Sequence, residues 1–456
     1  MRPGRRFLPV CERSRRYLLC VVKRTIGLLV LSLALAGSAS AATATISWQT
    51  DVATRGRVAY GVGGLYLYSA REAAPAHSHT ITLTDLAPST TYDYQAGPIR
   101  GQVTTDPLPM GARFGVDRTH VTANGSLVFP VLSYWQCEQT AAAAVEAGVT
   151  MFLQAPYTGC DAARPNDFSI GAIPASVRVL SDSYATDLAG SAGWYLPDEP
   201  DGWGIPPEQM PHLPPAAATG RLRVVNVSQH FYSAQAPINA TFDRGDYTRF
   251  AALGDLVGFD MYPIVKFCGR VPLLDVYRAQ RELMRVYAPG KPTFQWIETG
   301  RMTGECNAMQ VTPEIVNAES WLAVAGGACG IGYFTSSWTG ELWQRWDLSP
   351  GVAAQLSKTT AQLRALAPAL CIGTTGDVAV PWDSGVAATS RTLNGALYLL
   401  AINTTDAQKS VPMRVDTLAG RTLTLLGTTH TIRPARKIFL RDTLEPFQVH
   451  VYVAAP

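Results

Sequence analysis

The sequence lacks the short motifs by which several enzyme classes are recognised. It contains no Gly-x-Ser-x-Gly elbow, no Gly-x-x-x-x-Gly-Lys phosphate loop and no His-Glu-x-x-His zinc motif. Cys-x-x-Cys and His-x-x-x-His spacings are also absent, which argues against a structural metal. We therefore expect neither a metal nor a cofactor, and we look for the chemistry among the chain's own side chains.

Charged residues make up only 16% of the 456 residues, against 47% apolar residues. This composition is typical of a globular chain with a large core and room for two or three domains. The basic excess lies in the first 41 residues, which hold eight of the 38 basic and one of the 35 acidic residues. Without them 30 basic residues face 34 acidic ones, so nothing indicates a nucleic-acid partner.

The first 41 residues have the features of a signal peptide. A basic stretch is followed by an apolar run, Ile26–Ala36, and by the small residues Ser38–Ala41, after which we expect cleavage. The apolar run is shorter than the ~20 residues of a membrane-spanning helix and no second run follows, so we expect no transmembrane span after signal removal. The mature protein is predicted to be secreted or periplasmic, with its six cysteines in disulfide bonds.

Short runs with alternating apolar and polar residues fill residues 42–106 and predict an antiparallel β-sandwich. The segment Leu86–Tyr94, with Tyr92 at the position of a tyrosine corner, resembles a fibronectin type III module. The run Ile46–Asp51 is most similar to the N-terminal domain of purple acid phosphatases. Their metal-binding motifs are absent downstream, so this resemblance implies the module and not the phosphatase.

Short apolar runs alternate with helical stretches from residue 113 to residue 370. Eight such units over ~250 residues match a (β/α)8 barrel, or TIM barrel, in number and length. The predicted strands are 126–134, 149–154, 176–180, 193–196, 222–227, 256–262, 293–297 and 330–335, and clear helices are predicted over 140–147, 273–287, 312–325 and 352–366. Residues 372–456 return to strand patterns, so we predict a multidomain chain in which the barrel lies between an N-terminal and a C-terminal β-sandwich.

Two glutamates stand at the C-terminal ends of predicted strands, where chemistry is expected in such a barrel. Glu199 follows the fourth strand within Gly193–Asp201, and Glu298 follows the seventh within Pro292–Gly300. A single strand-end carboxylate often caps the next helix or pairs with an arginine. Two of them favour glycoside hydrolysis, in which a pair of carboxylates flanks the bond that is cut.

This placement resembles clan A of the retaining glycoside hydrolases. The resemblance implies that Glu199 is the general acid/base and that Glu298 is the nucleophile. An asparagine usually precedes the acid/base glutamate in this clan, whereas Asp198 precedes it here, which leaves the substrate class open. An ionised Asp198 would favour the protonated form of Glu199 and can still bind a sugar hydroxyl.

Further side chains are predicted to bind substrate. By the same resemblance, Tyr262 at the end of the sixth strand would hold the nucleophile charged, and Trp338 after the eighth would lie under the reacting sugar. Tyr134, Trp203 and His230 follow other strands and can contact a sugar, although each of these residues also fits packing at the barrel rim. Four polar residues at strand ends either bind hydroxyls or order the loops: Asp182, Asp201, Asn226 and Asp260.

The strand count also predicts the cysteine pairs, because the tips of consecutive barrel strands are neighbours. Cys137 and Cys160 follow strands one and two, and Cys268 and Cys306 follow strands six and seven. The last helix returns to the start of strand eight, which brings residue 371 beside residue 329. We therefore expect the pairs 137–160, 268–306 and 329–371, each with Cα atoms within about 7 Å.

The sequence thus predicts a secreted, monomeric glycoside hydrolase that cleaves β-glycosidic bonds of a poly- or oligosaccharide by double displacement. The alternative is a non-catalytic carbohydrate-binding or cell-envelope protein on a degenerate barrel, because fold alone does not fix function. Carboxyl groups ~5–5.5 Å apart would favour retention and ~6.5–9.5 Å inversion, whereas a buried pair would favour the binding protein.

Overall fold

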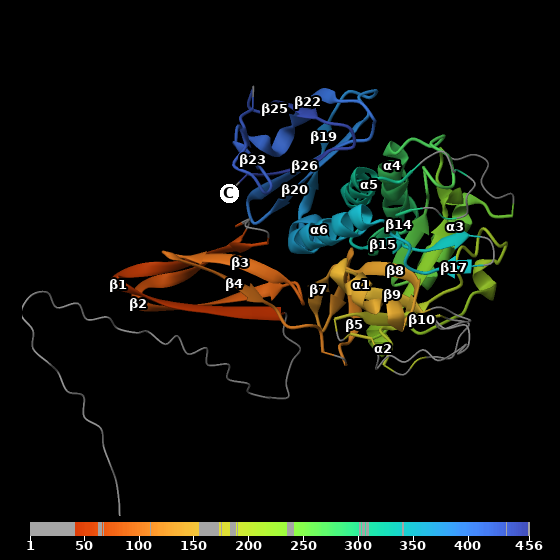
Figure 1. Ribbon diagram of the computed structural model, residues 1–456, viewed down its shortest axis with the longest axis horizontal. Helices are drawn as coiled ribbons and strands as arrows, with labels where there is room; N and C mark the ends of the chain where they lie inside the picture. Colours follow the sequence, from red (N-terminus) through yellow and green to blue (C-terminus); the bar gives the residue numbers. More distant parts are fainter. Residues whose placement is uncertain are drawn as a thin grey trace, which may run out of the picture. The chain divides into compact units, whose positions relative to one another are not determined.

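The computed structural model describes residues 42–62, 66, 68–109, 111–154, 173–174, 176–182, 188, 190–234, 241–300, 302, 306, 310–339, 342–434 and 436–454. The predicted signal peptide lies outside these residues. Along the described chain, antiparallel sheets precede and follow a closed parallel barrel (Figure 1). The predicted fold class, a TIM barrel with flanking β-domains, is therefore confirmed.

Four antiparallel strands form the first sheet, in the order β2-β1-β3-β4. They are β1 (Ala42–Gly61), β2 (Tyr68–Leu86), β3 (Thr91–Ala96) and β4 (Ile99–Thr104). One face is apolar because alternate residues of β1, namely Ala44, Ile46 and Trp48, are buried while the residues between them are exposed. The hydroxyl of Tyr92 accepts a hydrogen bond from the amide of Ala87 (2.9 Å), as a tyrosine at such a corner does. A three-stranded sheet follows, made of β5 (Phe114–Asp117), β6 (His120–Ala123) and β7 (Ser126–Val128).

Eight parallel strands close into the barrel. They are β8 (Val131–Gln136), β9 (Met151–Gln154), β10 (Arg178–Asp182), β11 (Gly193–Tyr195), β12 (Leu222–Ser228), β13 (Leu256–Asp260), β14 (Thr293–Glu298) and β15 (Ile331–Phe334). The last strand pairs with the first, with Ile331 opposite Val131. All eight predicted strands are present, so Glu199 does follow the fourth strand and Glu298 does end the seventh.

Two predicted strands differ from the observed ones in their bounds. The predicted first strand, 126–134, is interrupted at Pro130, which has no amide hydrogen for a ladder, so that β7 and β8 belong to different sheets. The predicted sixth strand extends to Tyr262, whereas β13 ends at Asp260, the last of its residues that pairs with β14.

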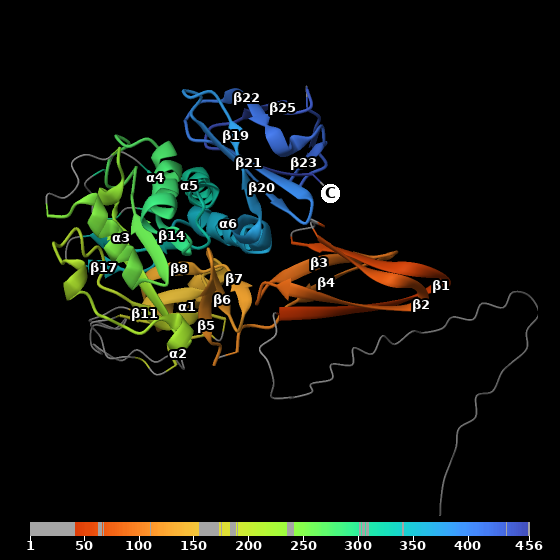
Figure 2. The same ribbon diagram turned by 180° about the vertical axis from the view of Figure 1, so that it is seen from behind.

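The helices lie outside the barrel strands, as Figures 1 and 2 show for α4, α5 and α6. The α-helices are α1 (Ala141–Glu146), α2 (Ala216–Thr219), α3 (Arg244–Leu253), α4 (Leu274–Glu282), α5 (Pro313–Gly326) and α6 (Pro350–Ala367). The 3-10 helices are η1 (Glu138–Thr140), η3 (Pro207–Gln209), η4 (Gln229–Phe231) and η7 (Asp416–Leu418), and the π-helices are η5 (Leu283–Tyr287) and η6 (Pro368–Ile372). Thr312 and Ser349 cap α5 and α6 by accepting amide hydrogen bonds, and each helix begins with proline. The barrel interior is filled by buried side chains that include Leu132, Leu153, Leu180, Leu222, Phe294 and Trp296.

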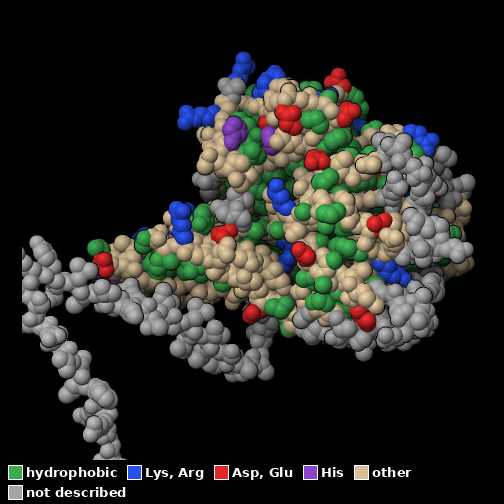
Figure 3. Space-filling view, viewed as in Figure 1, with side chains coloured by type: hydrophobic (Ala, Val, Ile, Leu, Met, Phe, Trp, Pro, Cys, Tyr) green, Lys and Arg blue, Asp and Glu red, His purple; other side chains and the backbone are tan. Residues whose placement is uncertain are grey.

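The C-terminal region consists of two antiparallel sheets with a shared apolar core. The first has the order β18-β20-β21-β26-β23-β24 and the second β19-β22-β25. Their bounds are β18 (Thr374–Gly376), β19 (Val378–Ala379), β20 (Val386–Leu393), β21 (Ala396–Asn403), β22 (Lys409–Val415), β23 (Leu423–Leu425), β24 (Thr431–Ile432), β25 (Phe439–Leu444) and β26 (Val449–Ala454); β16 (Ser337–Thr339) and β17 (Leu342–Gln344) form a hairpin after β15. On the face shown in Figure 3, acidic and basic side chains are interspersed.

Two of the three predicted cysteine pairs are confirmed. Cys268 and Cys306 are bonded with Cα atoms 5.2 Å apart, and Cys329 and Cys371 with Cα atoms 5.4 Å apart. Cys137 is also disulfide-bonded, and its predicted partner, residue 160, lies outside the described residues. Among the described helices, none combines the length and the apolar character that crossing a membrane requires.

Candidate active site

A cavity of about 250 Å³ lies at the C-terminal ends of the barrel strands. Its described lining residues belong to or follow six of the eight strands: Tyr134, Asp198, Glu199, Asn226, Asp260, Tyr262, Val265, Lys266, Trp296, Met302 and Phe334. This is the end of the barrel at which TIM-barrel enzymes carry their chemistry. Three carboxylic acids and four aromatic rings thus face one small space.

Asp198 is held by three hydrogen-bond donors. Its Oδ2 accepts from the hydroxyl of Tyr134 (2.7 Å), and its Oδ1 accepts from the hydroxyl of Tyr195 (2.8 Å) and from Nδ2 of Asn226 (2.9 Å). Burial and the charge of Glu199 raise the pKa of Asp198 to about 6, although the three donors oppose that rise. Asp198 is therefore ionised at neutral pH and titrates just below it.

Glu199 and Asp260 are neighbouring carboxyl groups of the same cavity. Glu199 has a left-handed backbone φ of 43°, which is uncommon for a residue with a side chain and persists only where the surroundings impose it. Burial, and then the charge and hydrogen bond of Glu199, raise the pKa of Asp260 well above its ordinary value. Asp260 therefore stays protonated at neutral pH and can donate a hydrogen bond to Glu199.

Glu298 does not face this cavity. Its side chain is fully buried, and its two carboxylate oxygens accept hydrogen bonds from the backbone amides of Ile264 (2.8 Å) and Val265 (2.6 Å). It also meets Glu319 of α5, whose pKa is raised well above its ordinary range by burial and by the charge of Glu298. Burial raises the pKa of Glu298 too, while the hydrogen bonds from Glu319 and the two amides lower it. Glu319 therefore holds the proton of this pair, and Glu298 holds the turn after β13.

The remaining predicted site residues divide into three groups. Tyr134 and Tyr262 line the cavity, although the structure gives Tyr262 no described bond to Glu298. Trp203 is 77% exposed, and His230 is half-buried with its Nδ1 2.8 Å from the hydroxyl of Ser228; neither belongs to the described cavity lining. For Trp338 the structure describes only the backbone, within β16, so its predicted role stays a prediction.

Five described lining residues of the cavity were not predicted as site residues: Val265, Lys266, Trp296, Met302 and Phe334. Trp296 could have been found, because alternation along β14 places it on the inward face with Phe294. Lys266 and Phe334 carry no comparable signal: Lys266 lies in a turn, and Phe334 is one of many apolar strand-end residues. Among the four polar residues that were weighed as hydroxyl binders or loop residues, Asn226 and Asp260 line the cavity, whereas Asp201 is fully buried against Ser228 and Tyr247.

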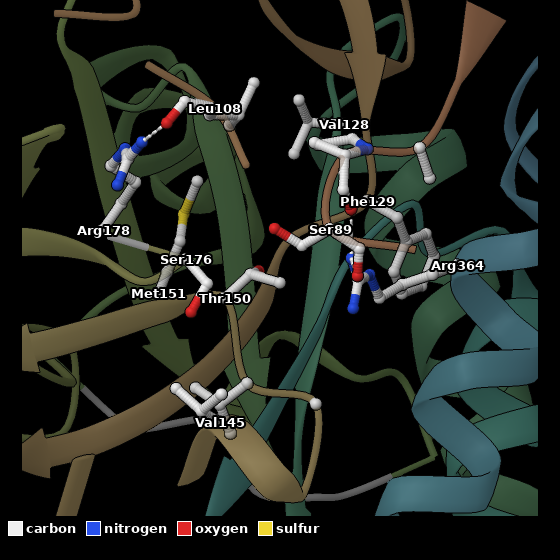
Figure 4. A pocket seen from close by; sticks show the side chains of 14 residues that line it. Ser89, Leu108, Val128, Phe129, Val145, Thr150, Met151, Ser176, Arg178 and Arg364 are labelled. Atoms are coloured by element: carbon white, nitrogen blue, oxygen red, sulfur yellow. Dashed lines mark hydrogen bonds between the residues drawn. The ribbon is translucent and has the colours of Figure 1, made fainter. Parts of the chain in front are cut away.

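A second cavity, of about 90 Å³, lies where β9 and β10 begin, at the opposite end of the barrel strands. Figure 4 shows Arg178 and Arg364 on its two sides and the dashed hydrogen bond from Arg178 to the carbonyl of Leu108. No carboxylate is present among its described lining residues, so it offers no acid/base pair. In the described part of the chain, no group of His, Cys, Asp and Glu side chains is arranged to hold a metal ion.

No protein-family model and no curated protein matches the sequence. Solved structures with a similar fold include an Anoxybacillus α-amylase, 12% identical, which covers 70% of this chain and 89% of its own with a TM-score of 0.42. A Bacteroides vulgatus structure, provisionally described as a glycoside hydrolase, is 10% identical and covers 91% of this chain and 98% of its own with a TM-score of 0.45. A family 30 endoxylanase from Clostridium papyrosolvens is 10% identical and covers 76% and 98% with a TM-score of 0.36. At such values the likeness carries no information about catalytic residues or substrate, which depend on the side chains of the cavity.

Proposed function

We propose that the chain is a glycoside hydrolase whose chemistry is carried by Asp198, Glu199 and Asp260. The observation that supports this is the difference in proton occupancy within one aromatic-lined cavity. Asp198 is ionised above about pH 6, while Asp260, whose pKa is raised well above its ordinary value, keeps its proton. Glycoside hydrolysis needs this combination of one protonated and one ionised carboxyl group.

In this proposal Glu199 is the general acid. Its side chain lines the cavity, and its Oε1 has no hydrogen-bond partner among the described residues, so this oxygen is not committed to another group. The proton of Asp260 passes through Glu199 to the oxygen of the leaving group while Asp198 attacks the anomeric carbon and the bond to the leaving group breaks. A water molecule then attacks the anomeric carbon, gives a proton to Glu199 and releases Asp198 from its bond to the sugar.

Asp198 is the proposed nucleophile in place of Glu298. Three donors stabilise its ionised form and fix its orientation. An attack by Glu298 would first require the loss of the hydrogen bonds that its carboxylate accepts from two backbone amides. Glu199 directly follows Asp198 in the chain, and both carboxyl groups line the same small cavity. We therefore propose a retaining mechanism by double displacement, and the resemblance to clan A makes β-linked glycans the first substrates to test.

The remaining proposals concern the rest of the chain. We propose cleavage of a signal peptide after Ala41 and an extracellular or periplasmic location, which two disulfide bonds within the described chain support. The boundaries 42–106, 113–370 and 372–456 and the fibronectin type III character of the first module also stand as proposals. The apolar face of the β1–β4 sheet and the Tyr92 hydrogen bond support that character.

One observation favours a second candidate, a carbohydrate-binding protein without catalysis. The glutamate that ends the seventh strand is sealed in the interior, as expected if the barrel had lost a strand-seven nucleophile. Such a protein would bind a glycan in the same cavity and leave it intact.

Hydrolysis of a panel of β-linked glycans by the purified full chain separates the two candidates. We expect reducing ends to appear with the wild type, to be almost absent with Glu199→Gln, and to persist with Glu208→Gln, an exposed glutamate that serves as the control. Proton NMR of the first product should give the β-anomer. Binding of a glycan without cleavage would instead establish the second candidate.

A further inference from the structure

The cavity contains two buried oxygen atoms with no hydrogen-bond partner in the described chain, Oε1 of Glu199 and Oδ1 of Asn226. Asn226 is only 1% exposed and lines the cavity. Its Nδ2 donates to Asp198 (2.9 Å) and Asp260 (3.5 Å), which fixes the orientation of the amide and leaves its oxygen as an acceptor. Buried polar atoms are almost always paired, so we expect a bound ligand to supply donors to these two oxygens.

The charge of the cavity also favours a ligand that donates hydrogen bonds. Three carboxyl groups line the cavity; Asp198 is ionised at neutral pH, whereas Asp260, whose pKa is raised well above its ordinary value, stays protonated. Lys266, which is exposed at the rim, is the one cationic side chain among the described lining residues. The hydroxyl of Tyr134 is already committed to Asp198. The cavity therefore offers acceptors and negative charge, with few free donors.

We propose that the cavity binds a sugar unit with a free, protonated amino group, such as the 2-amino-2-deoxyhexose units of a cationic glycan. This inference rests on the proposed function, since it names the substrate class for the same cavity. An ammonium group has three N–H donors and no acceptor, so it can satisfy both orphaned oxygens without bringing lone pairs toward the carboxylates. Its charge also balances the negative charge of the carboxylates in the cavity.

Neutral sugars fit the same atoms less well. A hydroxyl group supplies one donor and brings its own lone pairs, and an N-acetyl group supplies one N–H together with a carbonyl acceptor. An anionic sugar would add a further negative charge. Aromatic side chains line the cavity and can contact any of these sugars, and an aromatic ring attracts a nearby cation in addition.

The test is calorimetric titration of the full chain with three β-1,4-linked oligosaccharides of equal length, made of glucosamine, N-acetylglucosamine and glucose. We expect the glucosamine oligomer to bind at least about tenfold more tightly than the other two. Asn226→Leu should reduce this preference. Because that variant removes a buried hydrogen-bonding group and can fail to fold, Lys266→Met serves as a second variant: it is exposed, and removing its charge should increase the preference. Lys437→Met, which removes an exposed charge outside the cavity, should leave the preference unchanged.

Cleavage of the same oligomers, measured in parallel, keeps the two proposals distinguishable. Equal or tighter binding of the neutral oligomers overturns the amino-sugar inference, and their cleavage would leave the hydrolase proposal intact. Preferential binding of the glucosamine oligomer without cleavage supports the inference and contradicts the hydrolase. Binding of none of the three overturns the inference, as does a preference that Lys266→Met fails to increase in a folded protein.

Discussion

Three acidic side chains in one cavity differ because their immediate neighbours differ. Asp198 is surrounded by donors, which stabilise its ionised form, whereas Asp260 faces another carboxyl group, which stabilises its protonated form. Glu199 has both Asp198 and Asp260 as neighbours, and its backbone has a strained, left-handed φ. The proposed acid, Glu199, and the proposed nucleophile, Asp198, can therefore have different roles although they are consecutive residues.

The role of Glu199 as general acid can be tested with substrates of different leaving groups. Glu199→Gln should lower kcat/KM for natural glycans by about 10²–10⁴-fold, because the leaving oxygen then departs without a proton. Aryl glycosides whose leaving group needs no proton should be far less affected. Steady-state rates with both substrate types decide the matter, and an equal loss on both would contradict the assignment.

The pH dependence of activity should report Asp198. Its pKa is raised to about 6, so activity should fall as the pH drops through that value and the nucleophile becomes protonated. The groups that face it are Tyr134, Tyr195, Glu199, Asn226 and Asp260. Tyr134→Phe removes a donor to the ionised form and should move the acid limb of kcat/KM upward by about 0.5–1 pH unit. Tyr232→Phe, whose hydroxyl bonds to Asp275, is the control and should leave the limb in place.

At the scale of elements, the turn after β13 is fixed from two sides. Glu298 accepts hydrogen bonds from the backbone amides of residues 264 and 265, and the disulfide Cys268–Cys306 links the end of the turn to the segment after β14. This turn supplies Tyr262, Val265 and Lys266 to the cavity. The strand-seven glutamate thus affects the cavity by holding one of its walls.

Variants of Glu298 distinguish an anchor from a nucleophile. Glu298→Ala should lower the free energy of unfolding by about 2–4 kcal/mol, because two buried amides lose their acceptors. Added azide should not restore its activity, whereas azide would rescue a missing nucleophile and yield a glycosyl azide. Glu319→Gln keeps a donor toward Glu298 and should remain close to wild type in both denaturation and activity.

The sequence predicts the elements better than the direction of single side chains. Alternation and turn residues predict all eight barrel strands, and the strand order in turn predicts two observed disulfides. Alternation would also place Glu298 on the same face as Trp296, yet its carboxylate meets amides that lie 34 and 33 residues away in the sequence. No local pattern encodes such a contact. For the same reason Asp260 could be named as a polar strand-end residue but not as a carboxyl group whose pKa is raised by burial and by Glu199.

At the scale of the whole chain, one buried arginine connects the C-terminal sheets to the barrel. Arg391 of β20 is only 3% exposed and donates to the carbonyls of Val324 and Ala325 at the end of α5 (both 3.4 Å) and of Leu370 (3.4 Å). A cation near the C-terminal end of a helix is also favoured by the helix dipole. The guanidinium therefore supplies a donor to the carbonyl of Ala325 and a second donor to that of Val324, which also accepts from the amide of Gly327.

Removal of this arginine should destabilise the barrel and the C-terminal region together. Arg391→Met should lower the free energy of unfolding by about 2–4 kcal/mol, since it leaves buried carbonyls without donors. Arg414→Met removes an exposed ion pair with Asp416 and should cost less than about 1 kcal/mol. Thermal unfolding of both variants provides the comparison, and equal losses would contradict a bridging role for Arg391.

The pairing of Ile331 with Val131 has a consequence for the order of events during synthesis. The last barrel strand inserts between the seventh and the first, so the ring has an open edge until some two hundred residues after its first strand have been made available. Contacts so distant in sequence form slowly. This delay is compatible with the proposed export. The barrel cannot close while its first seven strands lack the eighth, so closure follows the passage of the eighth strand across the membrane.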